Sequence, residues 1–573
     1  MKCLIKISKM KNKPYLPLTQ NSLLLILILL LGLFLRTFKL EHQSFWLDEY
    51  YNICIALGLT ADKNGFELLP PGYFILLKSW LQFFPVNEVS ARLPGAIVGS
   101  FSILAFYFLA KEMFNRTIGL WASFFMAISA LHVDYCQEAK YYPLMLLFAI
   151  VTQLEYIKIL KYRRKEDFLY FTVFSAIGLY VYYYLGFLFI IQLIHALIFF
   201  RKEQGLVKKI FFCQMVALAT ALPLIIHILY TCTSSLNFFD TLSWLKKPTL
   251  FSLADTTLAM LTGQSWVYGP VIPLTPSSAC NLYAIFFIVC AMIAFRLKNQ
   301  IQQSRNWLVF LALWLFLPVA FFYLFSLLFV PFYHLRYLLF SLPAFFLLFA
   351  WLVDFKTTTE SIERRKDIYV CACTIGFLYA IYLFYLFFGH QLVTWIYYGK
   401  ASLFFKGIIT GQDSWPLESY LAKADRIFSN ILICVFFILT ILIPQKKRIT
   451  AHKILLVLLF TICNTSSLLY YFKYPVRTQL RETAEYISQR ANQKDRVLLR
   501  SPHLYDEKLL EYYFNRFGVD SSLSLERTKK GTAAANYNWI VDKFQDRKLE
   551  HNLTESFSKE SFLGVNLYKK KNP

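Results

Sequence analysis

The most informative shortage in this sequence is charge. Only 16% of the 573 residues are charged, whereas 57% are hydrophobic and the mean hydropathy is +0.47. An ordinary soluble domain is about a quarter charged. The chain has too little polar surface to enclose a water-soluble globule of this length, which excludes a soluble protein. The apolar residues form blocks such as 21–38 and 307–330 that are long enough to cross a bilayer.

Several common catalytic motifs are also missing. The sequence contains no Gly-rich phosphate loop, no HExxH and no Ser-His-Asp pattern in a credible context. Its 11 cysteines follow no metal-ligand spacing, although Cys232 and Cys280 bracket a loop and could pair. These absences argue against a nucleotide-sugar site of the soluble Rossmann kind and against a zinc centre. We expect no cofactor, and a single carboxylate-bound divalent cation stays open.

Acidic residues are few beside basic ones, 35 against 59, which makes the formal net charge +24. The basic residues form short runs between apolar blocks, as in 161–165, 201–209 and 446–453. This distribution follows the positive-inside rule, by which Lys and Arg gather in cytoplasmic loops. No basic stripe is interleaved with stacking aromatic residues, so we predict no nucleic-acid partner.

About thirteen apolar blocks have the length of a membrane span. The basic runs fall on every second loop, so these loops and the N-terminus are predicted to be cytoplasmic. No small-residue cleavage site follows the first block, which therefore reads as an uncleaved span. The blocks lie at 21–38, 93–110, 117–131, 142–160, 168–183, 186–200, 210–230, 281–295, 307–330, 336–353, 369–388, 429–443 and 454–471.

The chain after the last block has the composition of a soluble domain. It shows helical spacing at 483–491 and strand patterns at 496–499, 539–541 and 563–568. An odd number of spans puts this tail on the extracytoplasmic side. We therefore predict an all-α polytopic membrane domain over residues 1–471, with a first outer loop at 39–92, and a small extracytoplasmic α/β domain over 472–573.

Three polar clusters on the predicted outer loops are candidate sites, because loops on a rigid scaffold carry function. The first follows the first span, the second is a hairpin between two spans, and the third lies at the outer end of a later span. Ionisable groups at the edge of the apolar phase are costly unless they are paired or functional. The clusters are Phe45-Trp46-Leu47-Asp48-Glu49-Tyr50-Tyr51, the segment from His132 to Tyr142, and Tyr333-His334-Leu335-Arg336-Tyr337.

Each cluster has a functional and a plain structural interpretation. Asp48 and Glu49 are adjacent, so on a helix they point about 100° apart and cannot form the facing pair of a glycosidase. One of them can act as a base while the other braces the loop, or both can lie in a solvated interfacial loop. The 132–142 hairpin can equally be a mutually satisfied turn. Arg336 and Arg92 lie on the outer side and can grip a phosphate or snorkel to lipid headgroups.

Four short segments between residues 46 and 142 follow one another in a recognisable order. They are Trp46-Leu47-Asp48-Glu49, Leu69-Pro70-Pro71-Gly72-Tyr73, Ala91-Arg92-Leu93-Pro94-Gly95-Ala96 and Cys136-Gln137-Glu138-Ala139-Lys140-Tyr141-Tyr142. In order and spacing they resemble the WxDE element, the Pro-Pro helix, the RLPSA-like span start and the SQEARMY motif of a known family. This family is the GT-C glycosyltransferases of the protein O-mannosyltransferase and aminoarabinose transferase superfamily, and the similarity is to its bacterial, dolichyl-phosphate-mannose-protein mannosyltransferase-like branch.

The resemblance implies a membrane glycosyltransferase with a polyprenyl-phosphate-linked sugar as donor, inversion at the sugar carbon, and a lipid, glycan or protein as acceptor. It implies that Asp48 is the general base and that Glu49 orients the loop or the acceptor. Cations of the site would stabilise the departing lipid phosphate, and Trp46 with nearby tyrosines would form a wall on which the sugar stacks. The residues implied for substrate binding are Trp46, Arg92, Gln137, Glu138, Lys140, Tyr141, His334, Arg336 and Tyr337.

Two positions depart from the family pattern. Leu69 stands where family members often carry His or Lys before the Pro-Pro pair, and Lys140 replaces the usual Arg of QEAR. Lysine keeps the positive charge but loses the two-pronged grip of a guanidinium. The group that holds the lipid phosphate is therefore open, and Arg92, Lys140 and Arg336 are the candidates. The resemblance also favours a bacterial plasma membrane as the location.

Two other functions fit parts of the sequence. A polytopic transporter or lipid flippase would also have many spans, but no inverted repeat or Gly/Pro-broken helix pair marks a midplane site. A glycan polymerase or ligase would also use lipid-linked sugars, but we would expect it to centre on a large outer loop.

Overall fold

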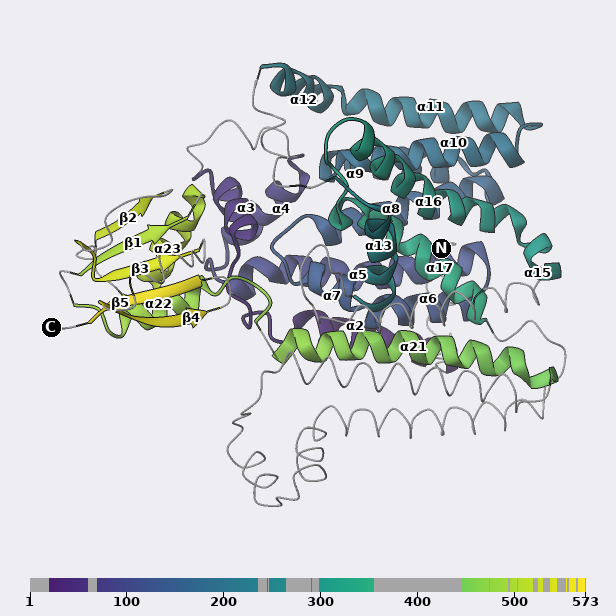
Figure 1. Ribbon diagram of the computed structural model, residues 1–573. Coiled ribbons are helices and arrows are strands. Elements are labelled where there is room, and N and C mark those ends of the chain that lie inside the picture. The colour runs from purple at the N-terminus through teal and green to yellow at the C-terminus, as the bar shows by residue number, and fades with distance from the viewer. Residues whose placement is uncertain are drawn as a thin grey trace, which may run out of the picture.

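The computed structural model describes most of the chain (Figure 1). The described residues are 20–59, 70–234, 245, 247–263, 290, 298–354, 445–473, 475–492, 495–501, 503–518, 524–528, 536–543, 553, 556–562 and 565–571. Three of the predicted spans, at 369–388, 429–443 and (apart from Cys290) 281–295, lie outside them, as do Leu69 and Cys280. The other ten predicted spans fall on helices.

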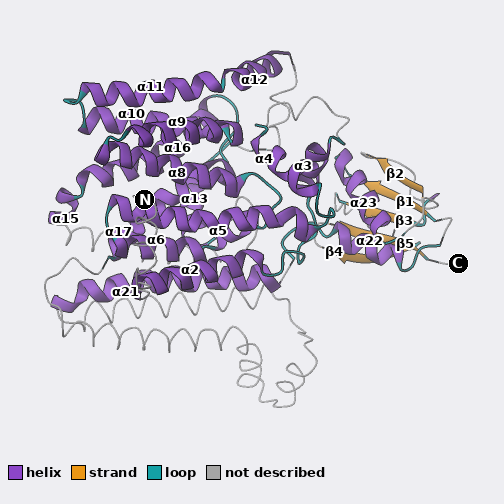
Figure 2. Cartoon of the chain, turned by 180° about the vertical axis from the view of Figure 1, so that it is seen from behind, coloured by secondary structure: helices purple, strands orange, loops and turns teal. Residues whose placement is uncertain are grey.

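The described part of the chain is a bundle of apolar helices with a small sheet at one end (Figures 1 and 2). Within the described residues, six helical segments are long and apolar enough to cross a membrane, and a bent pair makes a seventh if it is counted as one span. The six are α2 (Gln20–Thr37), α5 (Glu88–Met113), α8 (Tyr142–Tyr162), α16 (Arg305–Leu328), the segment Leu335–Val353 formed by η3 (Leu335–Ser341) and α17 (Leu342–Val353), and His452–Lys473 of α21 (Gln445–Lys473).

Shorter helices complete the bundle and its outer loops. Those in the bundle are α9 (Lys165–Val181), η1 (Tyr183–Gly186), α10 (Phe187–Phe199), α11 (Gln204–Thr220), α12 (Leu222–Ser234), α13 (Leu250–Thr262) and α15 (Lys298–Gln303). Two more, α3 (Leu47–Leu57) and α4 (Gly72–Leu81), lie at the end of the bundle that faces the sheet (Figure 1).

The bent pair consists of α6 (Arg116–Ile128) and α7 (Ala130–Cys136), which meet at 60°. Ser129 has extended backbone and its hydroxyl accepts a hydrogen bond from the backbone N–H of His132, so it caps α7. The last carbonyls of α6 are satisfied by Arg36 of α2, whose buried guanidinium donates to the carbonyl oxygens of Met126 at 2.8 Å and Ala127 at 3.1 Å. The break directs α7 toward the loop 137–141.

The C-terminal sheet has five strands in the order β2-β1-β3-β5-β4. Strand β1 is parallel to β2 and β3, whereas β5 is antiparallel to β3 and β4. Two helices, α22 (Leu480–Ser488) and α23 (Leu504–Arg516), pack with it. The strands are β1 (Arg496–Arg500), β2 (Ser524–Thr528), β3 (Trp539–Asp542), β4 (Phe557–Phe562) and β5 (Val565–Lys570).

Candidate active site

Asp48 lies in the first turn of α3 and contacts two cations that come from distant parts of the chain. Its Oδ2 accepts from Nζ of Lys140 at 2.6 Å and from the guanidinium of Arg336 at 3.1 Å. The Asp48 side chain is 36% exposed, whereas those of Lys140 and Arg336 are 5% and 13% exposed. The structure thus brings together one residue from each of the three polar clusters.

Aromatic rings surround the ammonium group of Lys140. Its Nζ lies 4.3 Å from the ring centroid of Trp46 and 5.5 Å from that of Tyr142. A cation over an aromatic face is attracted by the ring quadrupole, more strongly where water is excluded. The indole Nε1 of Trp46 is buried without a hydrogen-bond partner among the described residues. Trp46 therefore holds Lys140 in place and presents a free donor beside it.

Glu49 has a different environment from its neighbour, because it is fully buried. Arg92 binds it with two parallel hydrogen bonds of 2.8 Å, and Arg477 donates to it at 3.1 Å. The backbone N–H of Ala139 donates to it as well, at 2.9 Å. Burial alone would raise the pKa of Glu49, but Arg92 and Arg477 outweigh it and hold this pKa at about 2. Glu49 is a permanent anion that ties three segments together.

Arg92 has no donor left for a phosphate. Besides its two hydrogen bonds to Glu49, its guanidinium donates to the carbonyl oxygens of Leu40, Gln43 and Ser44, and its side chain is 1% exposed. An arginine has five N–H donors, and these contacts use all of them. The expectation that Arg92 grips the lipid phosphate does not fit this geometry. Its contacts instead fix the loop that leads to Asp48.

Arg477 is the central residue of the site that sequence reasoning missed. It follows α21 and makes ion pairs with Glu49 at 3.1 Å and with Asp134 and Glu138 at 3.0 Å each. A signal was available: Arg477 comes directly after the last span on the predicted outer side, where the positive-inside rule disfavours a cation. The same reasoning had singled out Arg336.

Glu138 is buried and only half satisfied. Its Oε1 accepts from Arg477, whereas its Oε2 is buried without a partner among the described residues. Burial raises the pKa of Glu138 to about 7, against the opposing charges of Arg477 and Lys140. This carboxyl group can therefore exchange a proton near neutral pH.

The remaining predicted residues of the 137–141 loop have positioning contacts. The side-chain amide of Gln137 donates to three carbonyl oxygens at the end of α2, those of Leu35, Arg36 and Phe38. Tyr141 stacks on Tyr182, with ring centroids 5.2 Å apart. Both residues hold the loop against the bundle, and the contacts found for Gln137 are to backbone rather than toward Asp48.

His334 and Tyr337 flank Arg336 at the start of η3. His334 accepts from the backbone N–H of Arg336 through Nδ1, at 3.2 Å, and so caps this 3₁₀ helix. The Tyr337 ring lies 5.5 Å from the guanidinium carbon of Arg336 and stacks on Phe332. The pair orients Arg336 toward Asp48.

Metal binding was left open by the sequence. Within the described residues, no group of three or more His, Cys, Asp or Glu side chains is arranged to hold a metal ion. The carboxylates near Asp48 are instead engaged by arginine and lysine.

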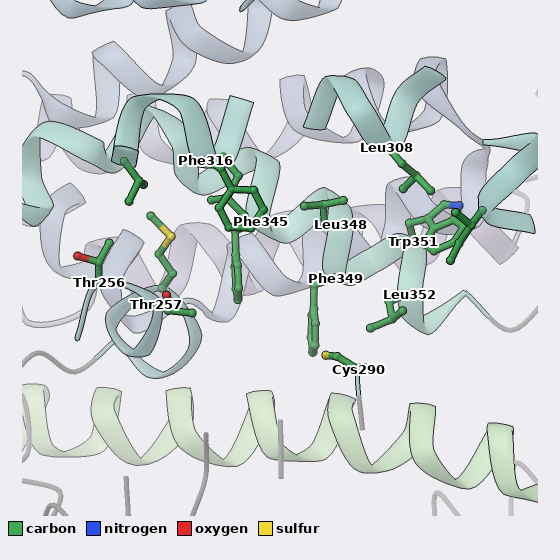
Figure 3. Close-up of a pocket in the computed structure, with 14 residues that line it drawn as sticks. Thr256, Thr257, Cys290, Leu308, Phe316, Phe345, Leu348, Phe349, Trp351 and Leu352 are labelled. Carbon is green, nitrogen blue, oxygen red and sulfur yellow. The ribbon is translucent and has the colours of Figure 1, made fainter. Parts of the chain in front are cut away.

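An apolar cavity of about 540 Å³ lies between α13, α16 and α17 (Figure 3). Its walls are almost entirely hydrocarbon and aromatic, with Phe316, Phe345, Phe349 and Trp351 among them. One of its ends is Thr256, whose hydroxyl shares a 2.7 Å hydrogen bond with the hydroxyl of Tyr333. Tyr333 belongs to the third polar cluster, three residues before Arg336 in the sequence.

Comparison with known proteins relates these features to a family. A profile of the dolichyl-phosphate-mannose-protein mannosyltransferase family matches residues 69–230. The matched segment contains Arg92 and the 137–141 loop, whereas Asp48, Arg336 and Arg477 lie outside it. No curated protein sequence matches the chain.

Two crystal structures of ArnT from Cupriavidus metallidurans share the fold. The structure bound to undecaprenyl phosphate is 12% identical, with a TM-score of 0.55, over 95% of this chain and 97% of that chain. The apo structure is 11% identical, with a TM-score of 0.54 and the same coverage. The chain therefore has the fold of these ArnT structures, with a bundle of membrane-spanning helices, and over residues 69–230 it is similar to the dolichyl-phosphate-mannose-protein mannosyltransferase family.

Proposed function

We propose that the protein transfers a sugar from a polyprenyl-phosphate carrier to a hydroxyl acceptor on the extracytoplasmic face of the membrane, with inversion at the sugar carbon and Asp48 as the general base. The observation that carries this proposal is the contact of the partly exposed Asp48 carboxylate with Lys140 and Arg336. The proposed base is therefore hydrogen-bonded directly to the two cations that are proposed to bind the phosphate.

The transfer step requires both kinds of group. The acceptor oxygen attacks the sugar carbon that is bonded to the phosphate, and Asp48 takes the proton of the acceptor hydroxyl. The bond between sugar and phosphate oxygen breaks, and its electron pair leaves with the polyprenyl phosphate. Lys140 and Arg336 stabilise the negative charge that develops on this leaving group. The products are the glycosylated acceptor and polyprenyl phosphate.

The apolar cavity is the proposed place for part of the carrier's hydrocarbon chain. Its lining offers an isoprenoid chain the same apolar surroundings as lipid, and its Thr256 end is joined to Tyr333 near Arg336. ArnT, which has the same fold, has been crystallised with undecaprenyl phosphate. A phosphate at Arg336 with its chain in this cavity is consistent with such a ligand.

The proposal includes an orientation. The candidate site and the C-terminal sheet lie at the same end of the bundle (Figure 2), and the basic loops of the sequence lie at the other. We propose that this end is extracytoplasmic, that residues 1–471 form the membrane domain and 472–573 the soluble one, and that the membrane is a bacterial plasma membrane.

The test compares the wild type with Asp48→Asn in lipid nanodiscs. Both are supplied with radiolabelled polyprenyl-phosphate sugars and an acceptor-containing membrane extract. We expect transfer by the wild type and a loss of about 10²–10⁴-fold in the variant, the range for removal of a general base. A melting curve verifies that the variant is folded. Equal transfer by both proteins would remove Asp48 from the mechanism, and lipid flux across vesicles without transfer would favour a transporter.

A further inference from the structure

The two cations that contact Asp48 meet on one oxygen atom. Lys140 Nζ and the Arg336 guanidinium both donate to Oδ2 of Asp48. Charge-assisted hydrogen bonds of this kind are about twice as strong as neutral ones. A carboxylate held in this way is a poor base, since protonation would remove the negative charge that strengthens both contacts. Burial alone would raise the pKa of Asp48, but Lys140 and then Arg336 keep it below its ordinary value.

The other nearby arginines cannot take over phosphate binding. Arg92 has all five donors engaged, and Arg477 is shared among Glu49, Asp134 and Glu138. Among the described residues around Asp48, a donor phosphate would therefore have to be held by the two cations that Asp48 already occupies.

We propose that Asp48 and the donor phosphate compete for Lys140 and Arg336, so that binding of the donor releases Asp48 from its ion pairs and makes it an active base. This inference rests on the proposed function, and it adds that binding of the donor controls whether Asp48 can act as a base. Without donor, Asp48 occupies the phosphate position and is restrained. With donor, the cations turn to the phosphate and Asp48 faces the acceptor.

The charge balance of the reaction agrees with this arrangement. The ion pairs form two groups: Asp48 with Lys140 and Arg336, and Glu49, Asp134 and Glu138 with Arg92 and Arg477. The first group has two cations and one carboxylate. A phosphodiester brings one further negative charge. During transfer the phosphate changes from a singly charged diester to a monoester with up to two charges, while Asp48 becomes neutral by accepting the proton. Lys140 and Arg336 therefore face nearly the same total charge before and after the step.

The test measures binding of undecaprenyl phosphate, the leaving group of the proposed reaction, to the full-length protein in detergent by equilibrium dialysis. Asp48→Asn removes the competing charge, so we expect it to bind the lipid about tenfold more tightly or better, although its sugar transfer falls by about 10²–10⁴-fold. The matched control is Asp134→Asn, which removes one carboxylate from the other ion-pair group, where Asp134 contacts Arg477. We expect the control to change binding by less than about threefold.

Double variants identify the cations. In a Lys140→Met, Arg336→Met background the lipid should bind more weakly, and the gain from Asp48→Asn should disappear, because the competitors are gone. Asp48→Ser serves as a second neutral variant, and a melting curve is recorded for each protein.

The outcomes separate the two proposals. Unchanged or weaker binding by both Asp48→Asn and Asp48→Ser, with sugar transfer by the wild type, would overturn the competition and leave the proposed function intact. An equal gain from Asp134→Asn, or a gain that persists without Lys140 and Arg336, would overturn it too. Absence of lipid binding and of transfer in every protein would overturn both.

Discussion

The adjacent carboxylates of the DE pair differ in what surrounds them, and the difference assigns their roles. Glu49 is buried and fixed by Arg92, Arg477 and a backbone N–H, whereas Asp48 is partly exposed and held only by side chains that could also bind a ligand. Adjacent residues on a helix point about 100° apart, so Glu49 can be buried while the neighbouring Asp48 stays partly exposed. We therefore expect Glu49 to position the loop and Asp48 to be the residue available for chemistry.

Replacement of Glu49 by Gln should mainly destabilise the fold. Loss of its charge leaves the buried Arg92 without its carboxylate partner and takes one of three from Arg477, and breaking a buried pair costs about 3–5 kcal/mol. We expect a markedly lower melting temperature in detergent, with transfer lost in parallel. Asp48→Asn is the comparison, and it should lower the melting temperature less, because the Asp48 side chain is 36% exposed. Equal melting temperatures for Glu49→Gln and the wild type would contradict the bracing role.

Glu138 should make stability depend on pH. Its pKa rises from an ordinary 4.5 to about 7 in the folded protein, so the folded state binds more protons than the unfolded state between these values. The free energy of unfolding then falls as pH rises through this window. Its slope against pH is at most the slope that corresponds to a difference of one bound proton between the two states. We expect the melting temperature to fall between pH 5 and 7.5. The Glu138→Gln variant lacks the titrating carboxyl group, so its melting temperature should fall less over the same pH range.

Glu485→Gln is the control for this pH experiment, since Glu485 is an exposed carboxylate on α22. It should keep the wild-type slope. If Glu138→Gln and the wild type show the same slope over pH 5 to 7.5, the assignment of the proton to Glu138 is wrong.

How far the sequence predicts the site can be judged residue by residue. The sequence predicted that Asp48, Lys140 and Arg336 lie in three polar clusters on outer loops, and the structure places the three residues in contact. Their chemical roles remain predictions. Arg477 was missed because its partners lie more than 300 residues earlier in the chain, and no local pattern records such a pairing. Arg92 was found, but its carbonyl partners depend on how the 40–44 loop folds around it.

At the scale of elements, the apolar blocks of the sequence predicted where helices lie. They did not predict where a helix is broken. The predicted span 117–131 ends in α7 beyond a 60° bend at Ser129, which needs Arg36 from another helix to satisfy the freed carbonyls. In the tail, the strand patterns at 496–499, 539–541 and 563–568 correspond to β1, β3 and β5. Strands β2 and β4 were missed because SLERT and FSKESF are too polar to show a buried face.

Close packing of α5 against α7 depends on glycine and can be tested at Gly99. A Cβ added there would lie 2.2 Å from Sγ of Cys136, at the end of α7. We expect Gly99→Ala to push α7 and the following loop away, which moves Glu138 and Lys140 and lowers transfer along with thermal stability. Overpacking of this kind costs about 1–3 kcal/mol.

The control for this change is Gly205→Ala in α11, where an added Cβ meets no atom within 4 Å. Alanine is the better helix former by about 1 kcal/mol, so this variant should be neutral or slightly more stable. Transfer by Gly99→Ala at the wild-type rate would show that the loop tolerates the displacement.

At the scale of the whole molecule, the C-terminal sheet and its helices are joined directly to the loop that carries Asp48. The buried Glu88 at the start of α5 makes ion pairs with Arg481 of α22 and Arg516 of α23. The hydroxyl of Tyr513 in α23 donates to Glu88 at 3.1 Å and accepts from the backbone N–H of Phe45 at 2.8 Å. The tail therefore braces the segment just before Asp48, and Arg477 braces Glu49 from the same side.

Removal of the Tyr513 hydroxyl should weaken this connection and disturb the site at a distance. Tyr513→Phe leaves the buried N–H of Phe45 unsatisfied, which costs about 1–3 kcal/mol, and deprives Glu88 of one donor. We expect a lower melting temperature and slower transfer, because the loop before Asp48 gains freedom. Tyr486→Phe is the matched control, since its hydroxyl makes only an exposed 3.3 Å contact with Glu560, and it should behave as the wild type. If Tyr513→Phe lost stability but transferred sugar at the wild-type rate, the tail would stabilise the protein without positioning Asp48.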